Sequence, residues 1–193
     1  MFATKRVLLR AIVILALGTS TAQSKECKGA NFADQLQVDG SSLTLNGLGL
    51  RLATALKVKV YVAGLYVAKT SGDPSAILGA TTPSELILQL VRNVDADDLR
   101  KGWNEGFEKN AKDQLPALKE RIAILNGWMP SVKTGDRLTF IHKPGTGIEV
   151  EVNGAMKGTI EGDDFAKAFL SIWLGAYPPN PEVKAGLLGG PCG

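Results

Sequence analysis

An arginine and a tyrosine ten positions apart are the two residues of this sequence best suited to hold an anion. Arg51 and Tyr61 both lie in a strand-like run from Leu50 to Ala68. In a regular strand an even separation places two side chains on the same face, so a guanidinium and a phenol would donate hydrogen bonds from one surface. Such a pair would bind an oxyanion or a carboxylate, because the arginine is always charged. The alternative is that both side chains lie on a solvated strand face, where most arginines are found.

Other residue patterns that support catalysis or metal binding are scarce. His142 is the only histidine, and its place in a strand pattern beside Lys143 is typical of an exposed strand end. One histidine and two distant cysteines make no cluster of metal ligands. Gly47 and Gly49 lack the third glycine of a dinucleotide-binding loop, and they lead into a strand rather than a helix. We therefore expect neither a metal nor a cofactor.

The first 22 residues have the pattern of a cleavable signal peptide. Three basic residues within the first ten precede the apolar run Ala11–Leu17, and the small residues of Gly18–Ala22 follow it. The apolar run is much shorter than the roughly 20 residues that a membrane span requires. We expect a signal peptide at residues 1–22, an exported domain at residues 23–193, and no stable membrane span after processing.

Removal of the leader would leave a chain without net charge. The whole sequence has 22 Lys and Arg residues, 19 Asp and Glu residues and a formal net charge of +3. Three of the basic residues and none of the acidic residues lie in the leader, which leaves 19 of each sign. A protein that binds nucleic acid needs a clustered basic face, so we expect no nucleic-acid partner.

The two cysteines lie near the two ends of the exported domain. Cys27 and Cys192 could pair as a disulfide in an oxidising compartment. Closing so long a loop would stabilise the fold by up to roughly 5 kcal/mol in the chain-entropy model. We expect the bridge, because both cysteines remain after processing and both lie at chain ends. The alternative is a pair of free or intermolecularly bonded thiols.

The turn signals and periodicities predict an α+β fold. An Asp-Gly pair at 39–40 predicts a hairpin, and an Asn-Gly pair at 46–47 predicts a further turn. Leu99, Trp103 and Phe107 recur every fourth residue, which gives a helix beginning at Asp95 one apolar stripe. Strands joined by hairpins and helices grouped together predict a large antiparallel sheet with helices against one face. The expected strands are 35–38, 42–45, 50–68, 86–94, 137–142, 148–152 and 155–160, and the expected longer helices begin at 95, 116 and 163, with a short one at 182–188.

Two segments resemble the chalcone isomerase family. The first combines Leu48–Arg51 with Lys57–Tyr66, and the second is Trp173–Gly186. With the order of elements, the resemblance covers nearly the whole exported domain and is closest to the bacterial exported, chalcone isomerase-like branch. It implies an open-faced β-sandwich, in which a layer of helices backs a large antiparallel sheet and a ligand cleft lies between them. Together with the leader, it implies a periplasmic location.

The resemblance also compares this sequence with the catalytic residues of the family. In chalcone isomerases an arginine binds the nucleophilic oxyanion of the substrate, and hydroxyl groups act on the ketone through water. Arg51 matches that arginine, and Tyr61 occupies the position of a strand threonine. Leu99 and Gly106 lie near the positions of the helix tyrosine and asparagine. The chain therefore lacks most of the family's catalytic residues.

Non-catalytic relatives that bind fatty acids use an arginine and a tyrosine to hold the carboxylate. Arg51 and Tyr61 resemble that pair, which implies a binder of a small amphiphilic acid such as a fatty acid. Trp103, Phe107 and Ile172 are candidates for the apolar wall of the cleft. Two alternatives remain: an isomerase, or intramolecular lyase, that acts on a chalcone-like enone, and an envelope interaction module whose cleft is filled by side chains.

Overall fold

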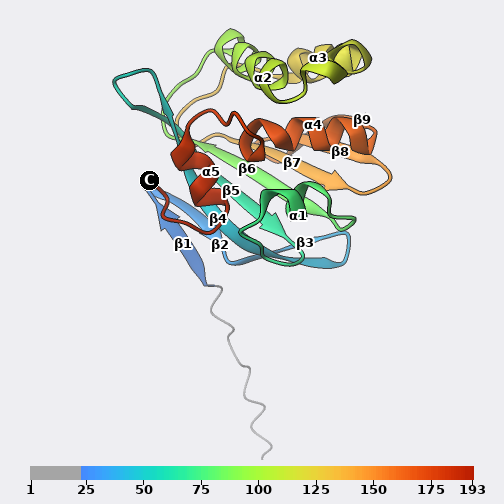
Figure 1. Ribbon diagram of the computed structural model, residues 1–193. Coiled ribbons are helices and arrows are strands. Elements are labelled where there is room, and N and C mark those ends of the chain that lie inside the picture. The colour runs from blue at the N-terminus through green and yellow to red at the C-terminus, as the bar shows by residue number, and fades with distance from the viewer. Residues whose placement is uncertain (1–22) are drawn as a thin grey trace, which may run out of the picture.

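A seven-stranded antiparallel sheet forms the centre of the protein, and helices cover one of its faces (Figure 1). The computed structural model describes residues 23–193, so the predicted signal peptide lies outside the described residues. The predicted α+β class is confirmed. The sheet contains, in spatial order, β3 (Gln35–Val38), β4 (Ser41–Ala53), β5 (Val58–Val67), β6 (Ser84–Leu90), β7 (Arg137–Lys143), β8 (Gly147–Val152) and β9 (Ala155–Glu161), and a separate pair is formed by β1 (Ser24–Cys27) and β2 (Ala30–Ala33).

The helices form where the sequence predicted them, with shifts of one or two residues at their ends. α2 begins directly after Asp95 and presents its apolar stripe to the sheet, with Leu99, Trp103 and Phe107 all buried. The helices are α1 (Pro74–Leu78), α2 (Ala96–Asn110), a single 3-10 turn (Lys112–Gln114), α3 (Leu115–Trp128), α4 (Asp163–Leu174) and α5 (Pro181–Leu187).

Each face of the sheet has its own apolar layer. On the helix side, the aromatic rings of α4 pack against those of α2 and against the sheet. The ring centroids of Phe169 on α4 and Phe140 on β7 lie 4.6 Å apart. On the opposite side, β1 and β2 cover the sheet, and the ring of Phe32 lies directly over Gly64. A Cβ atom at Gly64 would lie 2.6 Å from that ring, so this position requires glycine.

The run from Leu50 to Ala68 is a hairpin and not the single strand that we predicted. β4 ends at Ala53, residues 54–57 make a turn, and β5 begins at Val58. Thr54 and Lys57 adopt left-handed backbone conformations, with φ of 60° and 52°. The turn contains no glycine, asparagine, aspartate or proline, which are the residues that usually mark one, so the sequence contained no signal for it.

Three further local predictions were wrong. The Asn-Gly pair at 46–47 lies inside β4, at a shift in its register with β5, and forms no turn. The strand expected to reach Val94 ends at Leu90, and Val94 instead makes an isolated bridge with Val132. His142 lies at the end of β7 as predicted, but it is largely covered, and its Nε2 lies 3.3 Å from an oxygen of Asp163.

The C-terminal segment packs tightly along β4. The amide of Asn46 accepts a hydrogen bond from the Ser71 N–H at 2.7 Å and donates one to the Leu187 carbonyl at 2.7 Å. A Cβ atom at Gly47 would collide with the Gly186 carbonyl of α5, so glycine allows this close approach. This contact continues into the two segments that resemble the chalcone isomerase family, because a Cβ atom at Gly49 would collide with the Val183 carbonyl of α5.

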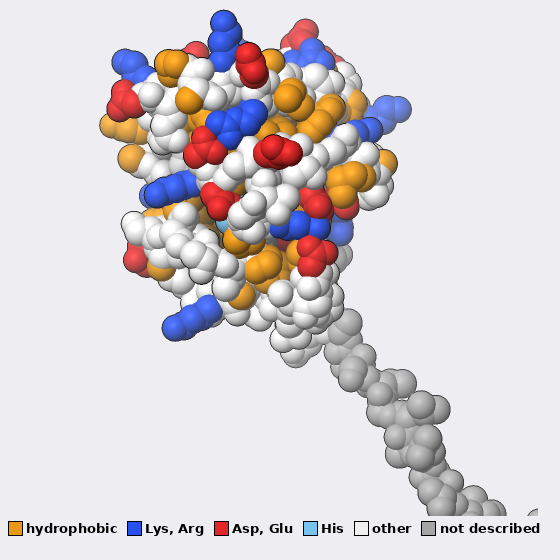
Figure 2. All heavy atoms as spheres, turned by 90° about the vertical axis from the view of Figure 1, so that its right-hand side faces the viewer, with side chains coloured by type: hydrophobic (Ala, Val, Ile, Leu, Met, Phe, Trp, Pro, Cys, Tyr) orange, Lys and Arg blue, Asp and Glu red, His pale blue; other side chains and the backbone are white. Residues whose placement is uncertain are grey.

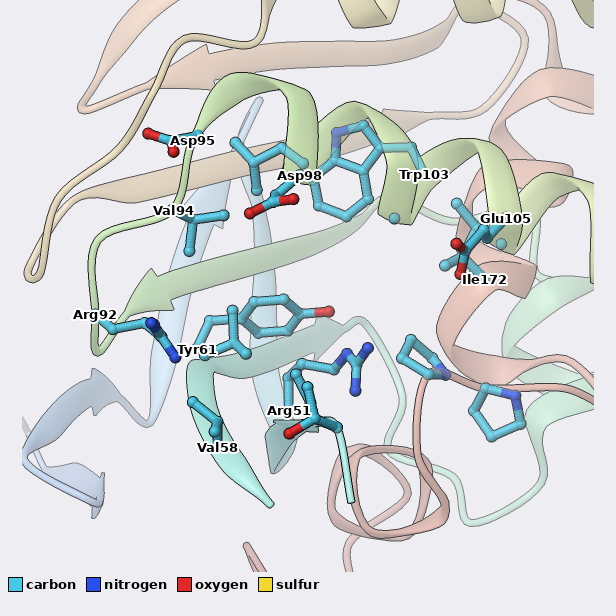
Figure 3. A pocket seen from close by; sticks show the side chains of 18 of the residues that line it. Arg51, Val58, Tyr61, Arg92, Val94, Asp95, Asp98, Trp103, Glu105 and Ile172 are labelled. Carbon is cyan, nitrogen blue, oxygen red and sulfur yellow. The ribbon is translucent and has the colours of Figure 1, made fainter. Parts of the chain in front are cut away.

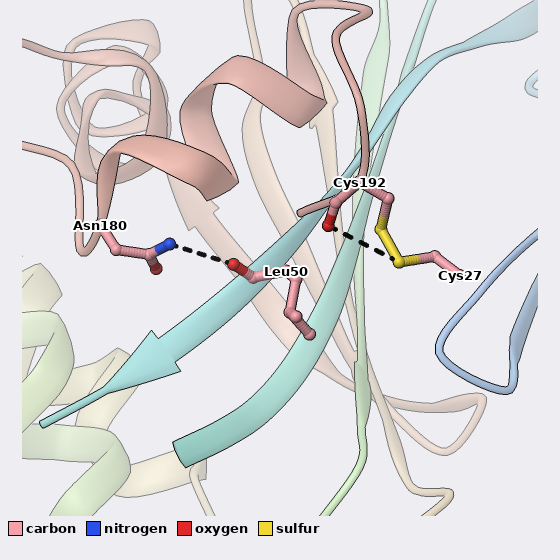
Figure 4. Close-up of a disulfide and its surroundings, with 4 residues drawn as sticks. All are labelled: Cys27, Leu50, Asn180 and Cys192. Carbon is pink, nitrogen blue, oxygen red and sulfur yellow. Dashed lines mark hydrogen bonds between the residues drawn. A yellow bond between two sulfur atoms is a disulfide. The ribbon is translucent and has the colours of Figure 1, made fainter. Parts of the chain in front are cut away.

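A disulfide joins Cys27 at the end of β1 to Cys192 near the C-terminus (Figure 4). The Cα atoms of the two cysteines lie 6.2 Å apart, and 165 positions separate them in the sequence. Both ends of the described chain are thereby held against the same edge of the fold, as the position of the C-terminus beside β1 in Figure 1 also shows.

The surface shown in Figure 2 carries charges of both signs close to one another. Blue and red side chains are interspersed there, and apolar atoms lie between them in small groups. This face has no extended region of a single charge.

Candidate functional site

A cavity of about 520 Å³ lies between the β4–β5 end of the sheet and helix α2 (Figure 3). The two strands form its floor, α2 forms its roof, and the loop that follows α4 closes one side. This volume falls within the usual range for sites that bind small molecules. Its lining includes Arg51, Val58, Val60 and Tyr61 from the floor, Leu99, Gly102, Trp103 and Gly106 from the roof, and Ile172, Tyr177, Pro178 and Pro179 from the side.

Arg51 and Tyr61 lie directly opposite each other on neighbouring strands. Opposite residues of an antiparallel pair project from the same face, so both side chains reach the cavity (Figure 3). The prediction that they share a face is correct, although they belong to two strands rather than one.

A β-bulge next to this pair brings an additional apolar side chain into the cavity. Arg51 pairs with Tyr61, but Leu52 pairs with Lys59, which leaves Val60 without an opposite residue. Val60 and Tyr61 therefore both line the cavity, whereas neighbours in a regular strand would point to opposite faces. Bulges commonly redirect side chains in this way at binding sites.

The guanidinium of Arg51 is half-buried and makes no ion pair within residues 23–193. Its one hydrogen bond in this part of the chain goes to the carbonyl of the next residue, Leu52. Because a guanidinium has five N–H donors, most of them remain available beside the cavity.

Tyr61 is 5 % exposed, and its hydroxyl accepts a hydrogen bond from Nε1 of Trp173 at 2.9 Å. Burial raises the pKa of Tyr61 to about 12, although the Arg51 charge and the Trp173 hydrogen bond act in the opposite direction. The phenol is therefore protonated at neutral pH. Its own hydrogen has no acceptor among the described residues, so it can be donated to a ligand.

The structure brings together four of the five residues that we expected to contact a ligand. Arg51, Tyr61, Trp103 and Ile172 all line the cavity. Phe107 does not: it is fully buried behind the cavity, where its ring packs 5.7 Å from that of Phe165 between centroids. Phe107 lies one turn further along α2 than Trp103, and at that point α4 covers the helix.

Two glycines on α2 shape the roof of the cavity. A Cβ atom at Gly106 would lie 2.6 Å from the Ile172 side chain, so glycine lets α4 pack closely here. A Cβ atom at Gly102 would meet nothing within 4 Å, so glycine at this position leaves the cavity open. Gly102 was not among the residues that we predicted to belong to the site. The sequence did contain a signal for it. Glycine is unfavourable inside a helix, and this helix contains two glycines four residues apart.

Charged residues of both signs surround the opening of the cavity. Arg92 and Lys109 are positive, and Asp95, Asp98 and Glu105 are negative. The acidic residues lie on α2 or directly before it, on the opposite side of the cavity from the β4–β5 hairpin (Figure 3). None of these five residues was predicted to belong to the site, because isolated charges on an exposed helix or loop form no specific sequence pattern.

Residues 24–189 match the family model described as chalcone isomerase-like. The chain belongs to this family. A crystal structure of a fatty-acid binding protein from Arabidopsis thaliana is similar to this chain, with a TM-score of 0.66 and 17 % sequence identity. The similarity covers 86 % of this chain and 96 % of that chain, and it confirms the predicted open-faced fold. None of the curated proteins matches this sequence significantly.

Residues 23–193 contain no group of three or more His, Cys, Asp or Glu residues placed to hold a metal ion. No helix in the same range has the length and apolar character needed to cross a membrane.

Proposed function

We propose that this protein is a non-catalytic binder of a small amphiphilic acid such as a fatty acid. One observation carries the proposal: Arg51 presents a half-buried guanidinium that has no carboxylate partner among residues 23–193, beside the protonated Tyr61, in an open cavity. A ligand carboxylate would accept charge-assisted hydrogen bonds from both groups. Its apolar part would lie against Trp103, Ile172 and Val60.

Binding is better supported than catalysis on an enone. The roof of the cavity presents Leu99 and Gly106, near the positions where chalcone isomerases carry a tyrosine and an asparagine, and neither has a polar side chain. Tyr61 and Arg51 could still hold an oxyanion, so an isomerase remains the alternative. The open cavity beside Arg51 argues against an interaction module whose cleft is filled.

The Arabidopsis protein of the same fold is named a fatty-acid binding protein, which supports the proposed class of ligand. A periplasmic location and membership in the bacterial exported branch are part of the same proposal. The leader pattern and the Cys27–Cys192 disulfide support export, because disulfides persist in oxidising compartments.

The test of the polar contacts uses dodecanoate as the probe and isothermal titration calorimetry as the measurement. Arg51→Gln should weaken binding by about 10- to 100-fold, the range expected for losing hydrogen bonds to a charged group. Lys157→Gln removes the same charge from the exposed surface of β9 and should bind like the wild type. Absence of dodecanoate binding, or equal affinity of the two variants, would contradict the proposal.

The test of the cavity is a variant that fills it without harming the helix. Gly102→Leu should abolish dodecanoate binding while stabilising α2 by up to about 1 kcal/mol, because glycine is a poor helix former. Gly127→Leu is the matched control, since a Cβ atom there also meets nothing within 4 Å but the residue lies on α3, outside the cavity.

A chalcone absorbance assay tests the isomerase alternative. Cyclisation of the chalcone faster than its spontaneous rate would favour the isomerase over the non-catalytic binder.

A further inference from the structure

The hairpin between β4 and β5 carries an exposed leucine at its tip. Leu56 is 87 % exposed, more than any other large apolar side chain among the described residues. Figure 1 shows this hairpin, in teal, extending beyond the sheet. The turn is hydrogen-bonded, with the Lys57 N–H donating to the Thr54 carbonyl at 3.1 Å and the Leu56 N–H donating to the Thr54 hydroxyl at 3.3 Å. The backbone therefore defines the turn that presents Leu56 to solvent.

The charge around this tip is positive. Residues 40–72 contain no aspartate or glutamate, although they include two exposed lysines beside the tip, Lys57 and Lys59. Arg92 is also exposed, and it lies beside β5 because the N–H of its neighbour Val91 donates a hydrogen bond to the Val60 carbonyl. Lys57 makes an exposed ion pair with Glu182, whose carboxylate lies 3.8 Å from the Lys57 ammonium.

The same hairpin forms one side of the cavity opening. Ala53, Thr54 and Val58, which flank Leu56 in the chain, line the cavity. On another side of the opening, Tyr177 is 64 % exposed and precedes two prolines that also line the cavity. An apolar surface that received Leu56 would therefore lie close to the entrance of the proposed ligand site.

We propose that this hairpin docks the protein on an anionic lipid surface. Leu56 enters the boundary between head groups and acyl chains, and Lys57, Lys59 and Arg92 contact lipid phosphates. One leucine on a narrow turn offers far less area than the roughly 800 Å² per partner of a stable protein interface, so the observations favour lipid over protein. A role in loading the cavity from the membrane rests on the proposed function, whereas docking itself does not.

Vesicle sedimentation tests the proposal with the oxidised protein. Vesicles of phosphatidylcholine with 30 % phosphatidylglycerol, about the charge of a moderately anionic membrane, should bind the wild type at least tenfold better than phosphatidylcholine alone. Leu56→Ser and the double variant Lys57→Gln/Lys59→Gln should each lose about tenfold. Met156→Ser is the matched control, because Met156 is 53 % exposed on β9, away from the cavity.

Three results would overturn the docking proposal: no sedimentation with either vesicle, equal binding to both, or unchanged binding by Leu56→Ser. The first would leave Leu56 as a contact for a protein partner. Gly102→Leu separates docking from ligand binding, because a filled cavity should leave vesicle sedimentation unchanged while dodecanoate binding is lost. A failure of membrane docking can thus be distinguished from a failure of ligand binding.

Discussion

Tyr61 divides its hydrogen bonding between the protein and the cavity. Its oxygen accepts from Trp173 at 2.9 Å, and its hydrogen remains available to a ligand. Trp173 is buried and packs against Trp103 and Phe169, with ring centroids 5.6 and 5.1 Å apart. We infer that Trp173 is a positioning residue, which holds the phenol in place for the ligand.

Trp173→Phe should separate this positioning role from packing. The variant keeps an aromatic ring but loses the N–H donor, so dodecanoate binding should weaken by about 3- to 10-fold, the effect of one neutral hydrogen bond. Titration calorimetry of the folded variant checks this. Trp128→Phe, on α3 and outside the cavity, is the control. Equal affinities of the two variants would leave Trp173 with a packing role only.

Glu85 is a buried carboxyl on the other face of the sheet. It is 8 % exposed, and burial followed by the repulsion of Glu151 raises the pKa of Glu85 to about 7. A carboxyl whose pKa is higher in the folded state favours folding while it is protonated. The free energy of unfolding should therefore fall as the pH rises from about 4.5 to about 7, because the folded state binds the proton more tightly in this interval.

Glu85→Gln should stabilise the protein above pH 7 and not at pH 4.5. A neutral amide avoids the buried charge, and the expected gain at pH 8 is about 1–3 kcal/mol. Urea unfolding at both pH values measures it. Glu120→Gln, which removes an exposed charge on α3, should show no such pH-dependent gain. A gain of the same size at both pH values would mean that another property of the substitution is responsible.

At the scale of elements, the segment before α5 supports the strand that carries Arg51. The side chain of Asn180 donates to the Leu50 carbonyl and accepts from the Leu52 N–H, both at 3.1 Å (Figure 4 shows the first). These are the two neighbours of Arg51 in the chain. A third bond, which Asn180 donates to the Glu182 carboxylate at 3.0 Å, links this contact to the start of α5.

Asn180→Ala should weaken dodecanoate binding by about 3- to 10-fold, since Arg51 would lose the support on both sides of its backbone. The control is Asn46→Ala, which removes comparable bonds between β4 and its neighbours but lies away from Arg51. Both variants should be less stable to urea by about 1–3 kcal/mol. Only Asn180→Ala should change the affinity of the folded protein, and equal affinities would contradict this role.

Most elements could be predicted from the sequence because their signals are local. The stripe of Leu99, Trp103 and Phe107 identified α2, and the Asp-Gly pair at 39–40 identified the first hairpin of the sheet. The β4–β5 turn could not be predicted, because its left-handed residues are a threonine and a lysine. Their conformation is imposed by the pairing of the two strands, which is a tertiary effect.

The site could be predicted only in part for a similar reason. Arg51 and Tyr61 were identified by their chemistry. The prediction that they share a face was correct although the strand assignment was wrong, because opposite residues on paired strands also share a face. The contribution of Trp173 depends on the packing of α4 against β5, a contact between residues 112 positions apart. Phe107 was misassigned because a helical stripe does not indicate which of its turns faces a cavity and which faces the core.

At the scale of the whole molecule, the disulfide joins the first strand to the last residues of the described chain. The double variant Cys27→Ser/Cys192→Ser should lower the free energy of unfolding by about 2–5 kcal/mol, because the bridge restricts a very long loop in the unfolded chain. Urea unfolding without reductant measures this. Neither cysteine lines the cavity, so dodecanoate affinity should remain unchanged in the folded variant. A loss of affinity at low urea would instead show that β1 and the C-terminal segment must be tied together for the Arg51 site to form.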